Sequence, residues 1–236
     1  MIPKKIHLAW INKNLLDSDS PLITHGVKNL IELNPEWEVT FYDDEEIDAY
    51  LKEKLDAPLY DLIADKHPVQ KTDLWRLIKI YTEGGLYTDI DRFCDTSLDD
   101  LIDEKTKWVL PICRNYDFSH DFMMSVPFNP AFETCINLYI DRLTRGYDNI
   151  YFLGAQTYMH ALTASIMGEM INTNPGKDAF DAIKDKLAEL EFIKVYEENP
   201  PYHTVIYRNN ELNLDWEQEK RKLYAEFGLR HWSNEW

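Results

Sequence analysis

The sequence predicts an α/β fold with a mainly parallel central sheet. Residues 6–10 form a short apolar run that is typical of a buried strand, and the Ser-Pro pair at residues 20–21 begins a helical stretch that ends near residues 34–35. Residues 37–42 alternate and are rich in β-forming residues, so a second strand is expected after that helix. A strand, a helix and a second strand in this order favour parallel pairing.

Length and charge restrict the classes of protein that the chain can be. It has 236 residues, of which 44% are hydrophobic, so we expect one globular domain over residues 1–236. The net charge of -17 disfavours nucleic acid as a partner, because affinity for a phosphate backbone comes from clustered Lys and Arg. The same acidity would repel a nucleotide diphosphate, so a bound nucleotide implies a divalent cation.

Cysteine spacing and hydropathy predict a reducing, cytoplasmic setting. Cys94, Cys113 and Cys135 are odd in number and widely spaced, which fits reduced thiols better than a disulfide framework or a zinc site. The first residues lack the apolar run of a signal peptide, and no stretch is apolar enough to span a membrane. We therefore expect a soluble protein of a bacterium or a virus-infected cell, with any membrane association being peripheral.

The most informative segment is a helix followed by a Gly-Gly pair and a strand with two carboxylates. The helix begins at Pro68 and stops at residues 84–85. In the strand at residues 86–91, Asp89 and Asp91 are two residues apart, so their side chains point the same way where the extended geometry persists. Strand ends bind ligands in open α/β sheets, and two such oxygen ligands suit Mg²⁺ or Mn²⁺ bridging a diphosphate.

The Asp-x-Asp pattern is weak by itself, since chance alone predicts roughly two matches in this acidic chain. The second match, Asp17 and Asp19, lies in a polar, turn-like segment where a solvated loop is the simpler interpretation. For the pair after residue 88, the alternative is an acidic turn at the end of a strand.

Asp73 and Arg76 are three residues apart on the preceding helix. They share a face of it, so they can contact one another or a common ligand. A simple surface ion pair is the alternative.

The rest of the chain predicts further alternating elements, without a repeat or a linker that would divide it. We expect strands at 108–112 and 122–126, helices at 130–145 and 157–171, a helix from the turn at 174–176 to about residue 189, strands near residues 193 and 205, and a last helix at 215–228.

Three motifs in this order resemble one family. Residues 2–10 (Ile-Pro-Lys-Lys-Ile-His-Leu-Ala-Trp), 72–76 (Thr-Asp-Leu-Trp-Arg) and 81–91 (Tyr-Thr-Glu-Gly-Gly-Leu-Tyr-Thr-Asp-Ile-Asp) are similar to the glycosyltransferases with a DXD sugar-binding region. That family includes fungal initiating mannosyltransferases, bacterial polysaccharide transferases and, more distantly, glucosylating clostridial toxins. The resemblance implies a GT-A type, Rossmann-like nucleotide-sugar-binding fold, with a donor-binding half at about 1–115 and an acceptor or closing half at about 116–236.

The resemblance also implies roles for five residues. Trp10 would lie at the nucleotide base, for which ordinary core packing is the alternative. Asp73 would contact the donor sugar or ribose, together with Arg76. Asp89 would bind ribose or sugar and help to hold the metal, and Asp91 would ligate Mn²⁺ or Mg²⁺ directly. Arg76, Asp89 and Asp91 would form the catalytic centre.

The last residues are similar to the family's closing segment, which folds over the diphosphate. His231 would complete the metal shell, while Ser233 and Trp236 would bind the donor. The spacing departs from the usual adjacent Ser-Trp pair, and a frayed terminus with aromatic packing is the alternative. Residues 154–157 (Gly-Ala-Gln-Thr) occupy a place where the family often has a turn near the donor or acceptor, although a plain helix start explains them equally well.

The activity that the resemblance implies is metal-dependent, retaining transfer of a hexose in polysaccharide biosynthesis. The donor would be a nucleotide-sugar, a UDP-sugar in preference to GDP-mannose, and the acceptor a hydroxyl of a glycan, a lipid-linked glycan or a protein. The cation would neutralise charge on the departing nucleoside diphosphate. Two alternatives are a non-catalytic nucleotide-sugar-binding module and a Mg²⁺-dependent aspartyl-phosphate phosphohydrolase, which fits less well because Arg92 and Phe93 follow the second Asp.

Overall fold

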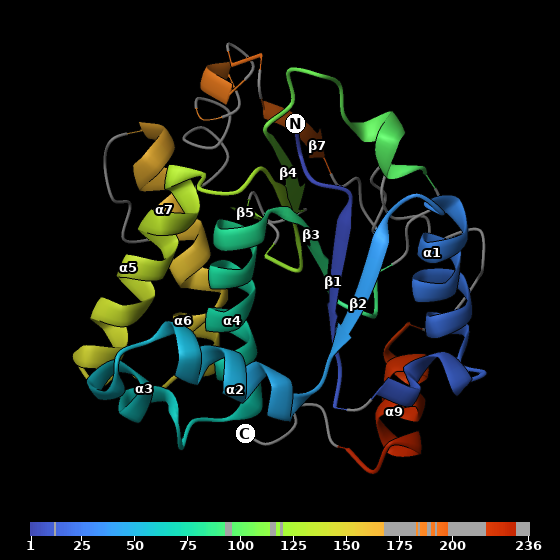
Figure 1. The fold of residues 1–236 in the computed structure, drawn as a ribbon, viewed down its shortest axis with the longest axis horizontal. Helices are drawn as coiled ribbons and strands as arrows, with labels where there is room; N and C mark the ends of the chain where they lie inside the picture. Colours follow the sequence, from blue (N-terminus) through green and yellow to red (C-terminus); the bar gives the residue numbers. More distant parts are fainter. Residues whose placement is uncertain are drawn as a thin grey trace.

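The computed structural model describes most of the chain and places its strands in a single sheet. It describes residues 1–11, 13–92, 96–113, 117–118, 120–167, 183, 185–187, 190–191, 193–197 and 216–229. The strands within these ranges are β1 (Lys5–Ala9), β2 (Glu38–Tyr42), β3 (Gly85–Thr88), β4 (Trp108–Cys113), β5 (Asp117–Phe118), β6 (Phe122–Ser125) and β7 (Ile193–Glu197). Their order across the sheet is β2-β1-β3-β6-β4-β5, with β7 beside β4 (Figure 1).

The sheet is mixed, but most of its strands share one direction. β1 runs parallel to both β2 and β3, and β4 runs parallel to β7. β6 is antiparallel to both β3 and β4, so β4 has the same direction as β1. Only β5 and β6 run the other way among the strands that the structure describes. The predicted α/β fold with a mainly parallel central sheet is confirmed.

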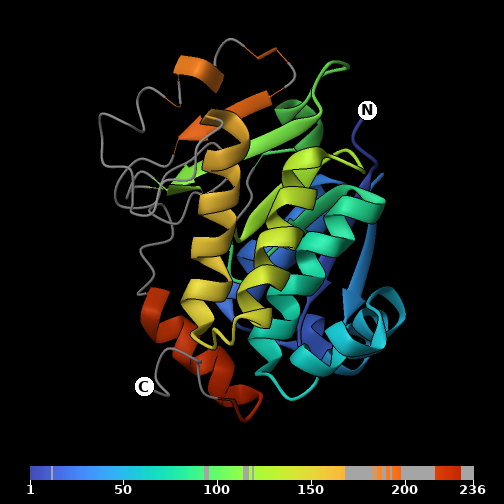
Figure 2. The same ribbon diagram turned by 90° about the vertical axis from the view of Figure 1, so that its left-hand side faces the viewer.

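Helices cover both faces of this sheet. They are η1 (Lys13–Asp17), η2 (Ile23–Lys28), α1 (Asn29–Leu33), α2 (Asp44–Lys54), α3 (Ala57–Ile63), α4 (Pro68–Glu83), η3 (Leu98–Leu101), α5 (Pro130–Thr144), α6 (Ile150–Leu153), α7 (Ala155–Met167) and α9 (Trp216–Glu226). α4, α5 and α7 lie side by side on one face, while α1 and α9 lie on the other (Figures 1 and 2). η2 is a π-helical segment that continues into α1, so the first predicted helix is observed with an irregular start.

Two hydrophobic clusters fill the space between the sheet and these helices. Neighbouring residues of one strand belong to different clusters: Leu86 is in the cluster that includes residues of α1 and α9, whereas Tyr87 is in the cluster that includes residues of α4 and α5. Met123 and Met124 on β6 divide in the same way. This follows from the alternation of side chains along a strand, and it gives the sheet two buried faces.

The Gly-Gly pair shapes the connection from α4 to β3. Gly84 and Gly85 have φ angles of +67° and +89°, which residues with a Cβ rarely adopt. A Cβ on Gly85 would lie 2.5 Å from the carbonyl oxygen of Lys5 on β1. The two glycines therefore let the chain reverse after α4 and bring β3 directly against β1.

Most predicted elements are observed near their expected bounds. The strand expected at residues 86–91 ends at Thr88, and the helix expected at 157–171 begins earlier, at Ala155, and is described only as far as Met167. The sequence did not predict the short elements η1, α3, η3, β5 and α6. Most of the helix expected before residue 189 and the strand near residue 205 lie outside the described residues. None of the helices described is long and apolar enough to cross a membrane.

Candidate active site

A cavity of about 530 Å³ lies where β1 and β3 end. Ala9, Trp10 and Ile11 line it from the end of β1, and residues 87 and 89–91 line it from the end of β3. Its other walls come from α4, from Asp44 at the start of α2, and from α9 with the residues after it. The residues from α4 and the turn before it are His67, Pro68, Val69, Thr72 and Arg76. The cavity thus occupies the strand-end position at which open α/β sheets bind ligands.

The helix α4 carries Asp73 and Arg76 into the protein interior. His67 caps its first turn by accepting a hydrogen bond from the amide of Val69, and Pro68 opens the helix at a position where no donor is lost. Asp73 and Arg76 are 4% and 5% exposed, and Arg76 Nη2 donates to Asp73 Oδ1 at 2.5 Å. The pair is therefore buried, which excludes the surface ion pair that was the alternative.

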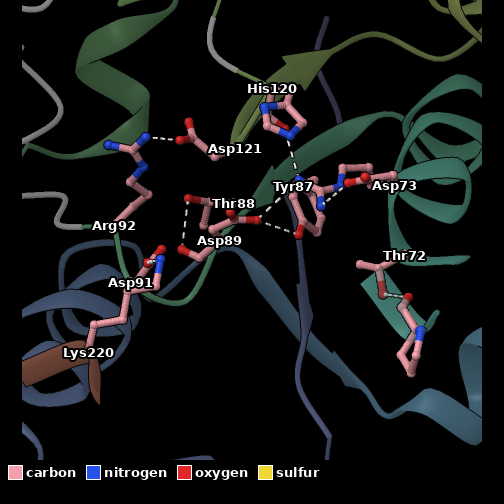
Figure 3. A network of polar contacts seen from close by, with 12 residues as sticks. Thr72, Asp73, Tyr87, Thr88, Asp89, Asp91, Arg92, His120, Asp121 and Lys220 are labelled. Atoms are coloured by element: carbon pink, nitrogen blue, oxygen red, sulfur yellow. Dashed lines mark hydrogen bonds and ion pairs between the residues drawn. The ribbon is translucent and has the colours of Figure 1, made fainter. Parts of the chain in front are cut away.

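The same guanidinium reaches the end of β3. Arg76 Nη1 donates to Asp89 Oδ1 at 3.2 Å and to the carbonyl oxygen of His120 at 3.1 Å. Tyr87 donates its hydroxyl to the same Asp89 oxygen at 2.6 Å, and its ring lies 4.6 Å from the guanidinium carbon (Figure 3). Charge-assisted hydrogen bonds of this kind hold a carboxylate in one orientation.

Burial and charge set the protonation of this network. Burial raises the pKa of Asp73 to about 6, and the adjacent Arg76 opposes that rise. Burial works against the charge of Arg76, yet Tyr87, Asp73 and Asp89 together raise its pKa above the ordinary value. Burial also raises the pKa of Tyr87 well above its ordinary value, so its hydroxyl remains a donor at neutral pH. Arg76 is thus a permanent cation between two carboxyl groups.

The two aspartates of the DXD motif have different surroundings. Because the strand ends at Thr88 and the amide of Arg92 donates to the carbonyl of Asp89 at 3.2 Å, Asp91 lies within a turn and not in an extended strand. The expectation of two side chains aligned by continued extended geometry is therefore wrong. Asp91 instead meets α9, where Lys220 Nζ lies 2.6 Å from Asp91 Oδ2 (Figure 3). Both carboxylates still line the same cavity.

Trp10 forms another wall of the cavity and also packs against α9. Its ring makes edge contacts with Tyr224 on this helix and with Phe227, the residue after it, at centroid distances of 5.3 Å and 5.5 Å. The residue is 8% exposed, so core packing, the alternative stated for it, accounts for much of its surface. Its indole Nε1 is buried and has no hydrogen-bond partner among the described residues, which leaves a donor beside the cavity.

Gly154 lies directly against Asp73. A Cβ on this glycine would lie 2.2 Å from Asp73 Oδ2. The corner between α6 and α7 that carries it is held by Arg142, which donates to Thr157 Oγ1 at 2.7 Å and to the carbonyl of Phe152 at 2.8 Å. Residues 154–157 therefore lie at the start of a helix, and they also adjoin Asp73, a predicted donor-binding residue.

The chemistry of the cavity fits a divalent cation that is shared with a diphosphate. The described residues contain no cluster of three or more His, Cys, Asp or Glu side chains that could hold a metal alone. Asp89 and Asp91 supply carboxylate oxygens, and the Asp89 side chain is 34% exposed. Mg²⁺ in particular is bound through one or two carboxylates together with substrate phosphates and water. The carboxylates present suit that mode of binding.

The structure adds site residues that the sequence did not predict. Tyr87 could have been found, because a residue two positions before Asp89 lies on the same face of the strand. Nothing in the sequence indicated that Lys220 or Tyr224 on α9 would line the same cavity as the DXD motif. Both acids of the second Asp-x-Asp match are exposed, as expected, but Asp17 is the last residue of η1 and only Asp19 lies in the loop after it. His231, Ser233 and Trp236 lie outside the described residues.

Comparisons with known proteins agree with this arrangement. Residues 21–108 match the family described as glycosyltransferase sugar-binding region containing DXD motif. Inositol phosphoceramide mannosyltransferase 1 of Schizosaccharomyces pombe is 26% identical over 136 residues, which are 58% of this chain and 42% of that protein. Inositol phosphoceramide mannosyltransferase 2 of the same organism is 32% identical over 142 residues, 58% of this chain and 38% of that protein.

A solved structure shares the fold over nearly the whole chain. PaToxG Glycosyltransferase superposes with a TM-score of 0.56 and 21% identity, covering 96% of this chain and 84% of that one. The expected GT-A type, Rossmann-like fold is thereby confirmed. The resemblance to the glycosyltransferases with a DXD sugar-binding region is confirmed by the match over residues 21–108, which includes Asp73, Arg76 and both aspartates of the motif. The chain spans only about two fifths of the length of these curated relatives.

Proposed function

We propose that this protein is a metal-dependent glycosyltransferase that moves a hexose from a nucleotide-sugar to an acceptor hydroxyl. One observation carries the proposal: Arg76 joins Asp73 to Asp89 at the wall of a cavity that Asp91 also lines. A carboxylate held by a buried cation has a defined orientation, which is what recognition of a sugar hydroxyl needs. The match to a sugar-binding region over the same residues supports this interpretation.

Each residue of the network has a separate role in the proposal. Asp73 accepts hydrogen bonds from hydroxyls of the donor sugar or ribose, and Arg76 and Tyr87 keep Asp89 oriented toward the same ligand. Asp89 and Asp91 hold Mn²⁺ or Mg²⁺, which when bound neutralises negative charge on the departing nucleoside diphosphate. Trp10 contacts the nucleotide base, and its buried Nε1 has no hydrogen-bond partner among the residues that the structure describes.

The division of the chain and the reaction partners also belong to the proposal. The donor-binding half is residues 1–115, and residues 116–236 form the acceptor or closing half, whose helix α9 already reaches the cavity. A UDP-sugar or GDP-mannose is the donor, and the mannosyltransferase names of the two yeast relatives support mannose as the transferred sugar. The acceptor is a glycan, lipid-linked or protein hydroxyl, and transfer retains the anomeric configuration. The cytoplasmic setting stays a prediction from the sequence.

The test is hydrolysis of a panel of UDP-sugars and GDP-mannose by the purified protein, with Mn²⁺ and with EDTA. We expect sugar release from one donor, dependent on Mn²⁺ and abolished by Asp91→Ala. Asp19→Ala is the matched control, because Asp19 belongs to the exposed Asp-x-Asp match and lies outside the cavity. Equal loss in both variants, or hydrolysis that EDTA leaves unchanged, would contradict the proposal.

A second measurement separates the enzyme from a non-catalytic binding module. The donor that is hydrolysed should also be transferred to an added acceptor hydroxyl, and proton NMR of the product should show the anomeric configuration of the donor. A donor that binds by calorimetry in the presence of Mn²⁺, but is neither hydrolysed nor transferred, would favour the binding module.

A further inference from the structure

A lysine from a distant part of the chain reaches one carboxylate of the DXD motif. Lys220 Nζ lies 2.6 Å from Asp91 Oδ2, and the two side chains are 21% and 12% exposed. Both residues line the cavity. An ammonium group therefore sits beside an oxygen that the proposed function gives to a divalent cation.

The position of Lys220 is set by the docking of α9. Leu223 on this helix is 1% exposed within the core cluster, and Glu226 accepts a hydrogen bond from Ser18 Oγ at 2.9 Å. Tyr224 and Phe227 pack against Trp10. Contacts on successive turns of α9 therefore hold the helix so that Lys220 faces the cavity. Lys222, two residues on, is instead 60% exposed and pairs with Glu219 on its own helix.

Lys220 is in direct ionic contact with Asp91 at the cavity. Lys220 thus neutralises part of an acidic site in the protein without ligands. A divalent cation bound to the same carboxylate would be repelled by the positive charge of the ammonium, so Lys220 in its present position opposes binding of the cation.

We propose that Lys220 is a built-in counter-ion of Asp91 that gives way when a divalent cation and a nucleoside diphosphate bind, and that it then pairs with the diphosphate. This inference rests on the proposed function. Its chemistry follows from the lysine side chain, a compact charge on a flexible four-carbon stem that can exchange one anionic partner for another nearby. Lys220 would then oppose binding of the cation alone and favour binding of the diphosphate.

These opposite effects define the experiment. Mn²⁺ binding is measured without nucleotide by electron paramagnetic resonance, and UDP and GDP binding with Mn²⁺ present by calorimetry, for the wild type, Lys220→Met and Lys220→Arg. For Lys220→Met we expect Mn²⁺ to bind more tightly and the nucleoside diphosphate more weakly, each on the order of tenfold for loss of one nearby charge. Lys220→Arg, which keeps the charge, should bind the nucleoside diphosphate about as tightly as the wild type does. Lys222→Met, the same substitution on the same helix, should change neither.

The outcomes separate this inference from a structural role and from the proposed function. Weakening of both Mn²⁺ and diphosphate binding in Lys220→Met would mean that the lysine only supports the fold of the site, and unchanged binding of both would mean that it has no role there. Either result overturns the inference. If Lys220→Met unfolds, Lys220→Arg still tests the inference. This variant keeps the positive charge, so a loss of diphosphate binding in it would also contradict the inference. If no nucleoside diphosphate binds to the wild type with Mn²⁺, the proposed function itself fails.

Discussion

Arg76 Nη1 on α4 lies 3.2 Å from Asp89 Oδ1 at the end of β3. The other terminal nitrogen of the same guanidinium donates to Asp73, so one cation holds a carboxylate on each of two elements. The planar fork of an arginine suits this double contact, which a lysine ammonium cannot reproduce with the same geometry. Stability and ligand binding should therefore depend jointly on Arg76.

Replacing Arg76 should destabilise the fold as well as the site. Arg76→Met leaves Asp73 buried without its cation, and removal of one partner from a buried pair costs about 3–5 kcal/mol. Urea unfolding measures the loss. Arg145→Met is the matched control, because Arg145 also pairs with an aspartate on its own helix but is exposed, and exposed pairs contribute about 1 kcal/mol or less. Equal effects of the two substitutions would contradict the role assigned to Arg76.

Tyr87→Phe should loosen Asp89 and weaken Mn²⁺ and donor binding. The substitution removes the hydroxyl that donates to Asp89 Oδ1 at 2.6 Å, and a hydrogen bond to a charged group contributes about 1.5–3 kcal/mol. Tyr139→Phe provides the comparison, since this buried hydroxyl donates at 2.8 Å to the backbone carbonyl of Gln70 and is not among the residues that line the cavity. Both variants should lose stability in urea, but only Tyr87→Phe should lower ligand affinity by calorimetry. Ligand affinity that is lowered equally in both would argue against a specific role for Tyr87.

Gly154→Ala should disturb Asp73 through direct contact. The added Cβ would lie 2.2 Å from Asp73 Oδ2, so the carboxylate must move away from its present position. We expect weaker donor binding and a loss of stability of about 1–3 kcal/mol, as is typical of overpacking. In an Asp73→Ala background the clash is absent, and the same substitution should cost much less. A double-mutant cycle in urea measures this coupling, and additive effects would contradict it.

His7 should contribute a loss of stability in mild acid. Burial lowers the pKa of His7 from 6.5 to about 4, while its Nε2 lies 3.0 Å from the carbonyl oxygen of Gly84. The unfolded chain therefore takes up a proton near pH 6.5 and the folded protein only near pH 4, so stability is lost as the pH falls through this window. This residue should account for about 2 kcal/mol between pH 7 and pH 5.

Urea unfolding of His7→Gln at both pH values isolates that contribution. Glutamine keeps an N–H donor for the Gly84 carbonyl but does not titrate, so the variant should lose less stability than the wild type between the two pH values. An identical loss in both proteins would show that other groups cause the pH dependence.

The local patterns of the sequence determined the fold class and the position of the motif. Apolar periodicity and the Gly-Gly pair at residues 84–85 are properties of neighbouring residues, so they predicted α4, β3 and the two aspartates after them. They also placed Asp73 and Arg76 on one helix face, because helical spacing alone decides this. The end of β3 was harder to predict from the sequence. The strand stops where the turn from Asp89 to Arg92 begins, and this turn has no strong local sequence signal.

Tertiary structure alone decided which side chains meet at the cavity. Lys220 opposite Asp91, and Gly154 against Asp73, are contacts between segments far apart in the chain. Trp10 against Tyr224 is another. Such contacts depend on how helices dock on both faces of the sheet, which is set by the packing of the whole core and leaves no periodic trace in the sequence. The sequence by itself therefore determined which residues could carry the chemistry, and only the packing of distant elements decided which charge each of them faces.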